Sequence, residues 1–187
     1  MEQIGLKDYF VVPGDFNLVL LDELLLNSDL NMINCCNELN AGYAADGYCR
    51  AQGAAALVLT FCVGGLSAIN AVGGAYAEDL PIIVISGGPN SNSAASHQLL
   101  HHTTGEHDYS YVRDMFAKVT AKAVIINDVH TAAYLIDDAI MTALEKQKPV
   151  YIEIACNLAD YVIPSPQPLA FLQQARSDNL SLQAAIE

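Results

Sequence analysis

The feature that most constrains the fold is a series of six short apolar runs that alternate with segments of helical character. The runs cover 9–12, 32–36, 56–61, 81–86, 123–126 and 150–154, and the helices are expected at 18–26, 38–51, 64–78, 111–117 and 128–146. Continuous apolar runs are typical of strands buried on both faces, and their alternation with helices is typical of parallel sheets. We therefore predict an α/β fold, an open, doubly wound, mostly parallel six-stranded sheet with helices on both faces.

The charge balance narrows the classes of partner. The 187 residues carry 8 Lys and Arg against 21 Asp and Glu, a formal net charge of −13. Such an acidic chain is a poor binder of nucleic acid or of an anionic membrane surface, and no apolar run is long enough for a membrane span. The five cysteines include no C-x-x-C pair, so we expect reduced core residues of a cytoplasmic protein and no zinc site.

The composition also suggests how the chain is divided. We predict one domain over 1–160, followed over 161–187 by a linker that begins with Pro164, Pro166 and Pro168 and by the start of a further, central domain. The chain enters its first strand almost at once, although folds of this class usually cover that strand with a preceding helix. From its start and its proline-rich end, we therefore expect the sequence to be a piece of a longer protein. Asp15 and Asn17 are expected to cap the helix at 18–26.

Glu38 is the first candidate for chemistry. It follows the second apolar run and opens a helix whose faces are nearly all Ala and Gly, including Gly42 and Ala45. A carboxylate that opens such a helix among small side chains suggests a tight, apolar site suited to proton transfer. The alternative is a glutamate placed at a helix N-terminus because the helix dipole favours it there.

Other polar residues follow the strands on the same expected edge. Ligands of open parallel sheets bind outside the carboxyl ends of the strands. Those ends carry Asp15, Glu38 and Thr60, and the loop after the fourth strand leads to His101 and His102. Read singly, Asp15 could be a helix cap, Thr60 an ordinary strand-end residue, and the histidines solvated loop residues.

Several known motifs do not occur. His97 and His101 are four residues apart but form no H-E-x-x-H, so a metal pair is not expected there. The sequence also lacks G-x-G-x-x-G, G-x-x-x-x-G-K-[ST] and G-x-S-x-G. The expected site is therefore acidic and histidine-bearing, without a phosphate cradle of its own.

These residues lie in stretches that resemble the pyrimidine-binding domain of thiamine-diphosphate-dependent pyruvate decarboxylases. The similarity extends from about Gly5 to Asn157, and its strongest segments are 12–22, 35–40 with 47–48, 73–78, 100–103 and 149–157. The string C-C-N-E-L-N and the paired histidines distinguish it from acetolactate synthase-like enzymes. The resemblance implies that most of the family's first helix, the central domain and the diphosphate-binding domain with its G-D-G…N-N motif lie outside this sequence.

The resemblance also implies roles and partners. Glu38 would hydrogen-bond the pyrimidine ring of thiamine diphosphate and move the proton that activates the cofactor. Asp15, His101 and His102 would handle the substrate carboxylate and product protonation, with the Thr60 hydroxyl nearby. Pyruvate or a related 2-oxo acid would lose CO₂ and give acetaldehyde. Mg²⁺ and the diphosphate would be held by a neighbouring subunit, so we expect a dimer at least and a homotetramer in the complete enzyme. The alternative is a non-catalytic dimerisation domain that has kept the fold.

Overall fold

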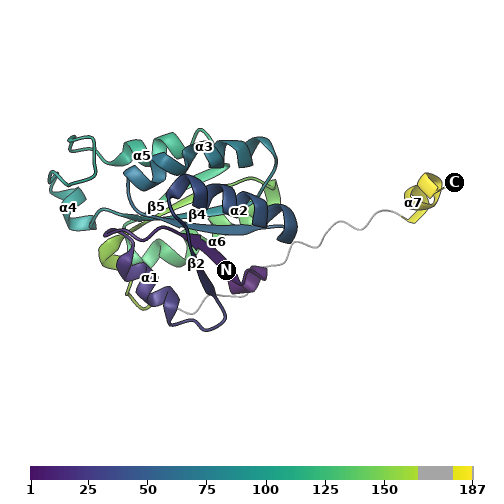
Figure 1. Cartoon of the computed structure of the whole chain (residues 1–187), viewed down its shortest axis with the longest axis horizontal. Helices are drawn as coiled ribbons and strands as arrows, with labels where there is room; N and C mark the ends of the chain where they lie inside the picture. Colours follow the sequence, from purple (N-terminus) through teal and green to yellow (C-terminus); the bar gives the residue numbers. More distant parts are fainter. Residues whose placement is uncertain (164–178, 187) are drawn as a thin grey trace.

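The computed structural model describes residues 1–163 and 179–186, and its central feature is one parallel sheet (Figure 1). The strands are β1 (Asp8–Val11), β2 (Asn31–Asn34), β3 (Ala55–Leu59), β4 (Ile82–Gly88), β5 (Lys122–Ile126) and β6 (Val150–Ala155). All five pairings are parallel, in the order β2-β1-β3-β4-β6-β5. The predicted six-stranded α/β sheet is confirmed.

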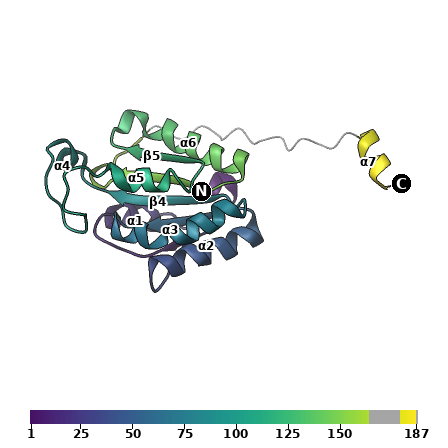
Figure 2. The same ribbon diagram turned by 90° about the horizontal axis from the view of Figure 1, so that it is seen from above.

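Helices connect successive strands. The described helices are α1 (Leu18–Leu25), α2 (Glu38–Gln52), α3 (Val63–Ala77), α4 (Ser91–Ala95), α5 (Ser110–Phe116), α6 (Val129–Lys146) and α7 (Asn179–Ile186), with short 3₁₀ turns η1 (Glu2–Ile4) and η2 (Cys156–Leu158). Figure 2 shows α6 on one side of the sheet and α2 and α3 on the other. None of the described helices is long and apolar enough to cross a membrane.

Each face of the sheet has its own apolar core, which confirms the predicted double winding. On one face, α2, α3 and α5 contribute Ala45, Val72 and Phe116 to a core that also contains Leu57 and Tyr151 of the sheet. On the other face, α1 and α6 contribute residues such as Leu21 and Ile140. Because both faces are covered, the central strand β3 is buried along its whole length.

Strand β2 departs from the prediction of a buried second strand. It lies at one end of the strand order, and its burial pattern is mostly exposed, with Ile33 39% exposed. An apolar run alone does not distinguish an edge strand from a central one. The same edge explains a second correction, because Cys36 at the end of this run is exposed and is not a core residue. Cys35 and Cys156 are only partly buried, so the core prediction holds for Cys49 and Cys62, and all five cysteines are free thiols as expected.

Of the predicted N-terminal helix caps, Asp128 is confirmed and Asn17 is wrong. Asp128 caps α6 as predicted, since its side chain accepts a hydrogen bond from the His130 N–H. Asn17 occupies the N-cap position of α1, but its side chain instead accepts from the Gly14 N–H at 2.9 Å and donates to the Val12 carbonyl at 3.2 Å. The prediction that Asn17 caps α1 through its side chain is therefore wrong, because the preceding turn takes both of its polar atoms.

The region after β4, expected to be a loop as far as about residue 107, contains the short helix α4. Asn90 caps it, and Asn157 holds its first residue, because the Asn157 side chain accepts from the Ser91 N–H at 2.8 Å. The predicted proline linker, 164–168, lies outside the described residues. The domain boundary near residue 160 stays a prediction.

Candidate functional site

The site begins where the strand order reverses. From β1 the chain passes to β2 on one side, whereas β3 and β4 continue on the other, so the connections that follow β1 and β3 leave in opposite directions at a switch point. Gly14 after β1 and Thr60 after β3 approach closely there. A Cβ atom on Gly14 would lie 2.6 Å from the Thr60 Cβ, so a larger residue at position 14 would displace Thr60.

Glu38 reaches the same point from α2. The Asn37 side chain caps this helix by accepting from the Asn40 N–H at 2.8 Å, which fixes Glu38 in the first turn. A Cβ atom on Gly64, at the start of α3, would lie 3.2 Å from Glu38 Oε1 and 3.0 Å from Thr60 Cγ2. Glu38, Thr60, Gly14 and Gly64 therefore form one contact group, which we call the Glu38 group.

The close approach of two helices holds this group together. Gly42 on α2 faces Ala71 on α3, and a Cβ atom on Gly42 would lie 2.7 Å from the Ala71 Cβ. The small residues that the sequence placed around Glu38 therefore pack α2 against α3. They bring the first turns of the two helices together, so that Glu38 of α2 lies beside Gly64 of α3.

Thr60 supplies an unsatisfied polar atom to the group. Its side chain is buried, with 6% exposure, and its hydroxyl has no hydrogen-bond partner among the described residues. A buried hydroxyl without a partner costs free energy, so such groups commonly mark a place where a ligand or water supplies the partner. The Glu38 group thus offers a carboxylate and a free hydroxyl beside two glycines.

Asp15, His101 and His102 form the second part of the site, which we call the histidine group. The His101 imidazole Nε2 contacts the Asp15 carboxylate, and the two histidine rings meet edge to face with centroids 4.8 Å apart. All three side chains are exposed, and one potential ligand atom from each lies within 4.8 Å of the others. By geometry they could share a proton or hold a metal ion.

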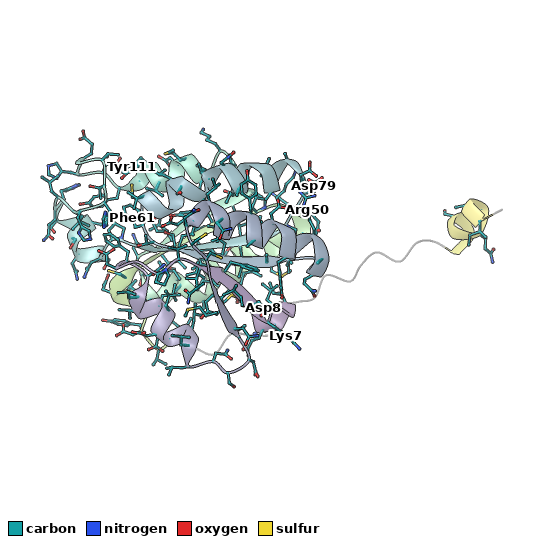
Figure 3. All side chains as sticks on the ribbon, viewed as in Figure 1. Lys7, Asp8, Arg50, Phe61, Asp79 and Tyr111 are labelled. Atoms are coloured by element: carbon teal, nitrogen blue, oxygen red, sulfur yellow. The ribbon has the colours of Figure 1, made fainter. Side chains whose placement is uncertain are left out.

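Aromatic contacts fix the position of His101. Its ring stacks on Phe16 at a centroid distance of 5.2 Å, and Phe16 in turn meets Phe61 edge to face at 5.6 Å. Tyr111 holds the far end of the histidine loop, because its hydroxyl accepts from the Thr104 N–H at 3.3 Å and lies 2.9 Å from Cys62 Sγ. Figure 3 shows Phe61 and Tyr111 at one end of the sheet, opposite Arg50 and Asp79.

Two features indicate that the histidine group is more than a solvated loop. His102 has a φ of 58°, in the left-handed region that most residues with a Cβ avoid. Partial burial raises the pKa of Asp15, but the hydrogen bond and charge of His101 outweigh it, so the pKa lies below its usual value. Asp15 is therefore held as a carboxylate beside two imidazoles, a combination suited to acid–base chemistry.

The structure brings the five predicted residues into two groups that adjoin along the chain, since Asp15 follows Gly14 directly. Asp15 does not cap α1, because Asn17 occupies that position. Sequence reasoning missed Glu153 at the same edge of the sheet. It is 3% exposed, and burial raises its pKa to about 7, although a hydrogen bond from Tyr151 opposes the shift. Its only signal was a single acidic residue inside the apolar run 150–154.

Comparison with known proteins gives a consistent result. Residues 1–112 match the family described as thiamine pyrophosphate enzyme, N-terminal TPP binding domain. Over 190 aligned residues the chain is 52% identical to pyruvate decarboxylase 1 of Pisum sativum and 53% identical to pyruvate decarboxylase 3 of Arabidopsis thaliana. Pyruvate decarboxylase 2 of Oryza sativa subsp. japonica is 50% identical over 188. These alignments cover 99% of the chain but only 31–32% of each relative, so the chain spans about a third of their length.

Proposed function

The chain belongs to the family of thiamine pyrophosphate enzymes, which it matches through their N-terminal TPP-binding domain, and we propose that it is the pyrimidine-binding portion of a pyruvate decarboxylase. The observation that carries the proposal is the Glu38 group. It combines a carboxyl group, a buried hydroxyl without a partner among the described residues, and two glycines whose missing side chains let Thr60 and Glu38 approach closely. This donor set suits a flat, nitrogen-containing ring such as an aminopyrimidine.

In this proposal each residue has a distinct task. Thiamine diphosphate, when bound, would supply the thiazolium ring that takes up the electrons of decarboxylation. Glu38 holds the pyrimidine ring by a hydrogen bond and moves a proton at a ring nitrogen. Asp15, His101 and His102 exchange protons with the substrate, because a carboxylate and two imidazoles in contact can act as base and acid. Thr60 offers its hydroxyl beside them.

The proposal requires partners. The acidic composition supports Mg²⁺ and a diphosphate-binding domain from a neighbouring subunit, since 8 Lys and Arg among 187 residues offer few cations for a diphosphate. Exposed Tyr43, Val63 and Tyr76 on α2 and α3 support association through this face, as a dimer at least and a homotetramer in the complete enzyme. We further propose pyruvate or a related 2-oxo acid as substrate, acetaldehyde and CO₂ as products, and a cytoplasmic role in alcoholic fermentation.

The test is Glu38→Gln in the chain assembled with a diphosphate-binding domain. Glutamine keeps the size and can still hydrogen-bond a ring nitrogen, but it has no exchangeable carboxyl proton. With thiamine diphosphate and Mg²⁺ bound, hydrogen–deuterium exchange at the thiazolium C2, followed by NMR, should slow by at least about 10²-fold. Glu23→Gln, a change on α1 away from the site, is the matched control and should leave the exchange rate unchanged.

Unchanged exchange in the Glu38→Gln protein, with cofactor still bound, would contradict the proposed role. Glu38 would then be a helix N-terminal residue, whose replacement costs about 1 kcal/mol of stability or less. That result would favour a non-catalytic dimerisation domain, which predicts association without cofactor activation.

A further inference from the structure

A cavity separate from both groups lies at the carboxyl ends of β5 and β6. Its volume is about 580 Å³, and its walls come from these strands, from the segment that contains α4 and from the start of α5. The lining does not include Asp15, Glu38, Thr60, His101 or His102. What the cavity binds is therefore a question apart from the proposed decarboxylation.

Glu153 is the buried acid in the cavity wall. The Tyr151 hydroxyl donates a hydrogen bond of 2.8 Å to Glu153 Oε2, and within the described residues the other carboxylate oxygen has no hydrogen-bond partner. Gly88 of β4 makes room for this side chain, because a Cβ atom there would lie 2.7 Å from Glu153 Cγ. The backbone thus accommodates a carboxylic acid to which Tyr151 is the one hydrogen-bond donor among the described residues.

Several other polar groups of the cavity are acceptors or acids, and Ser91 and Asn127 carry donors as well. Asp108 is a carboxylate bound to the Ser110 N–H and hydroxyl, and these hydrogen bonds lower its pKa. His107 Nδ1 donates to the His97 carbonyl at 2.7 Å, which leaves Nε2 as an acceptor in the neutral ring. Tyr109 has a buried hydroxyl without a partner among the described residues.

Positive charge is scarce around the cavity. No Lys or Arg belongs to its lining, and Arg113 of α5 acts on Glu153 through its charge without a hydrogen bond to it. Within the described residues, the one set of His, Cys, Asp or Glu close enough to hold a metal ion is the histidine group, not this lining. The volume also exceeds what one ion needs, since a water molecule occupies about 30 Å³ of liquid. An acidic, acceptor-rich cavity of this size suits an organic cation.

We propose that the cavity binds a small organic cation with a primary ammonium group, and that Glu153 is its counter-ion. An ammonium has three N–H donors, which match the unbonded carboxylate oxygen of Glu153 and neighbouring acceptors such as His107 Nε2. The apolar wall residues, among them Ala94 and Ile125, suit a short alkyl chain. Such binding requires the ionised form of Glu153.

The affinity should therefore depend on pH. Because burial raises the pKa of Glu153 to about 7, the acid is mostly neutral at pH 6 and mostly ionised at pH 8. The charged and titratable groups that face it are Tyr151, Arg113, Asp108, His97 and His107. The apparent affinity should rise by about tenfold from pH 6 to pH 8, because the ionised fraction of Glu153 rises by that factor.

The test titrates the 187-residue chain with propylammonium and, separately, with propan-1-ol, without thiamine diphosphate. Amide NMR shifts should change around the cavity with propylammonium, and propan-1-ol should bind at least about tenfold more weakly. Glu153→Gln should weaken propylammonium binding by at least about tenfold. Glu106→Gln, at an exposed position in the nearby loop, is the matched control and should leave the affinity unchanged.

A second variant keeps Glu153 and fills the space. Ala94→Leu on α4 should abolish propylammonium binding while leaving the amide shifts of the sheet unchanged. Equal binding of the alcohol and the ammonium, unaltered affinity in Glu153→Gln, or no propylammonium binding at pH 8 would each overturn the proposal. These measurements do not involve Glu38 or the cofactor, so they are independent of the decarboxylase test.

Discussion

Two carboxylates at the same edge of the sheet show opposite behaviour. Asp15 follows β1 in an exposed loop, and its contact with His101 lowers its pKa. Glu153 lies within β6, and burial raises its pKa to about 7. The difference comes from their surroundings, because solvent and imidazoles favour the charged form whereas a closed wall favours the neutral one. One sheet edge can therefore hold a permanent anion and an acid that titrates near neutral pH.

The largest expected effect is on the free energy of unfolding. It comes from a substitution that forces β4 away from the loop that carries Asp15. Gly87 of β4 lies against the loop that carries Asp15, and a Cβ atom there would lie 2.0 Å from the Phe16 carbonyl oxygen. Since the obstacle is backbone, it cannot move aside as a side chain can. Gly87→Ala should lower the free energy of unfolding by more than about 3 kcal/mol or prevent folding, as measured by urea denaturation.

The control for this change is Gly74→Ala on α3, where an added Cβ atom meets nothing within 4 Å. It should stabilise the chain by about 1 kcal/mol or less, since alanine is the better helix former. Equal unfolding free energies for Gly87→Ala and the parent chain would show that the loop and β4 are not held together as described.

The next largest effect is the pH dependence of stability that Glu153 causes. The folded-state pKa of Glu153 is about 7 and its ordinary value is 4.5, so between these values the unfolded chain ionises while the folded chain keeps the proton. Stability should fall as pH rises through this window, by roughly 3 kcal/mol in total. Glu153→Gln should remove this loss. Parallel stability–pH curves for the two proteins between pH 4.5 and 7, from urea titrations, would contradict it.

Asp15 should have the smallest effect on stability, and its pH dependence should have the opposite sign to that of Glu153. Because its folded-state pKa is lowered, its contribution is present above the ordinary value of 3.8 and is lost as pH falls through the folded-state value. The Asp15 and His101 side chains are 46% and 60% exposed, so solvent screens the pair. Asp15→Asn should cost less than about 1 kcal/mol in unfolding measurements near pH 6, and less still in high salt. A loss as large as that of a buried pair would show that solvent does not screen it.

The sequence was a good guide wherever a pattern is local or follows from strand direction. Apolar runs located the strands, and capping chemistry located the start of α6 at Asp128. The meeting of Asp15 with His101 also followed, because residues after parallel strands share one edge. These inferences depend on the spacing of apolar residues along the chain and on the parallel direction of the strands. Neither depends on the details of tertiary packing.

Other features depended on tertiary neighbours. The exposure of β2 comes from its place at the end of the strand order, and the Asn17 side chain turns to Gly14 because of the loop geometry. Glu153 was missed because one acid in an apolar run forms no motif. Its environment is set by Tyr151 and Gly88, and only the folded register brings Gly88 beside the carboxyl group.

The strand order also dictates the sequence of assembly. In the described part of the chain β5 pairs only with β6, which follows it in the sequence, and β6 pairs with β4 on its other side. During synthesis β5 must therefore wait for β6 before it can join the sheet, whereas β1, β2 and β3 can pair as soon as residue 59 has emerged. A nascent chain can thus bring Glu38 and Thr60 together while the strand that carries Glu153 is still unmade.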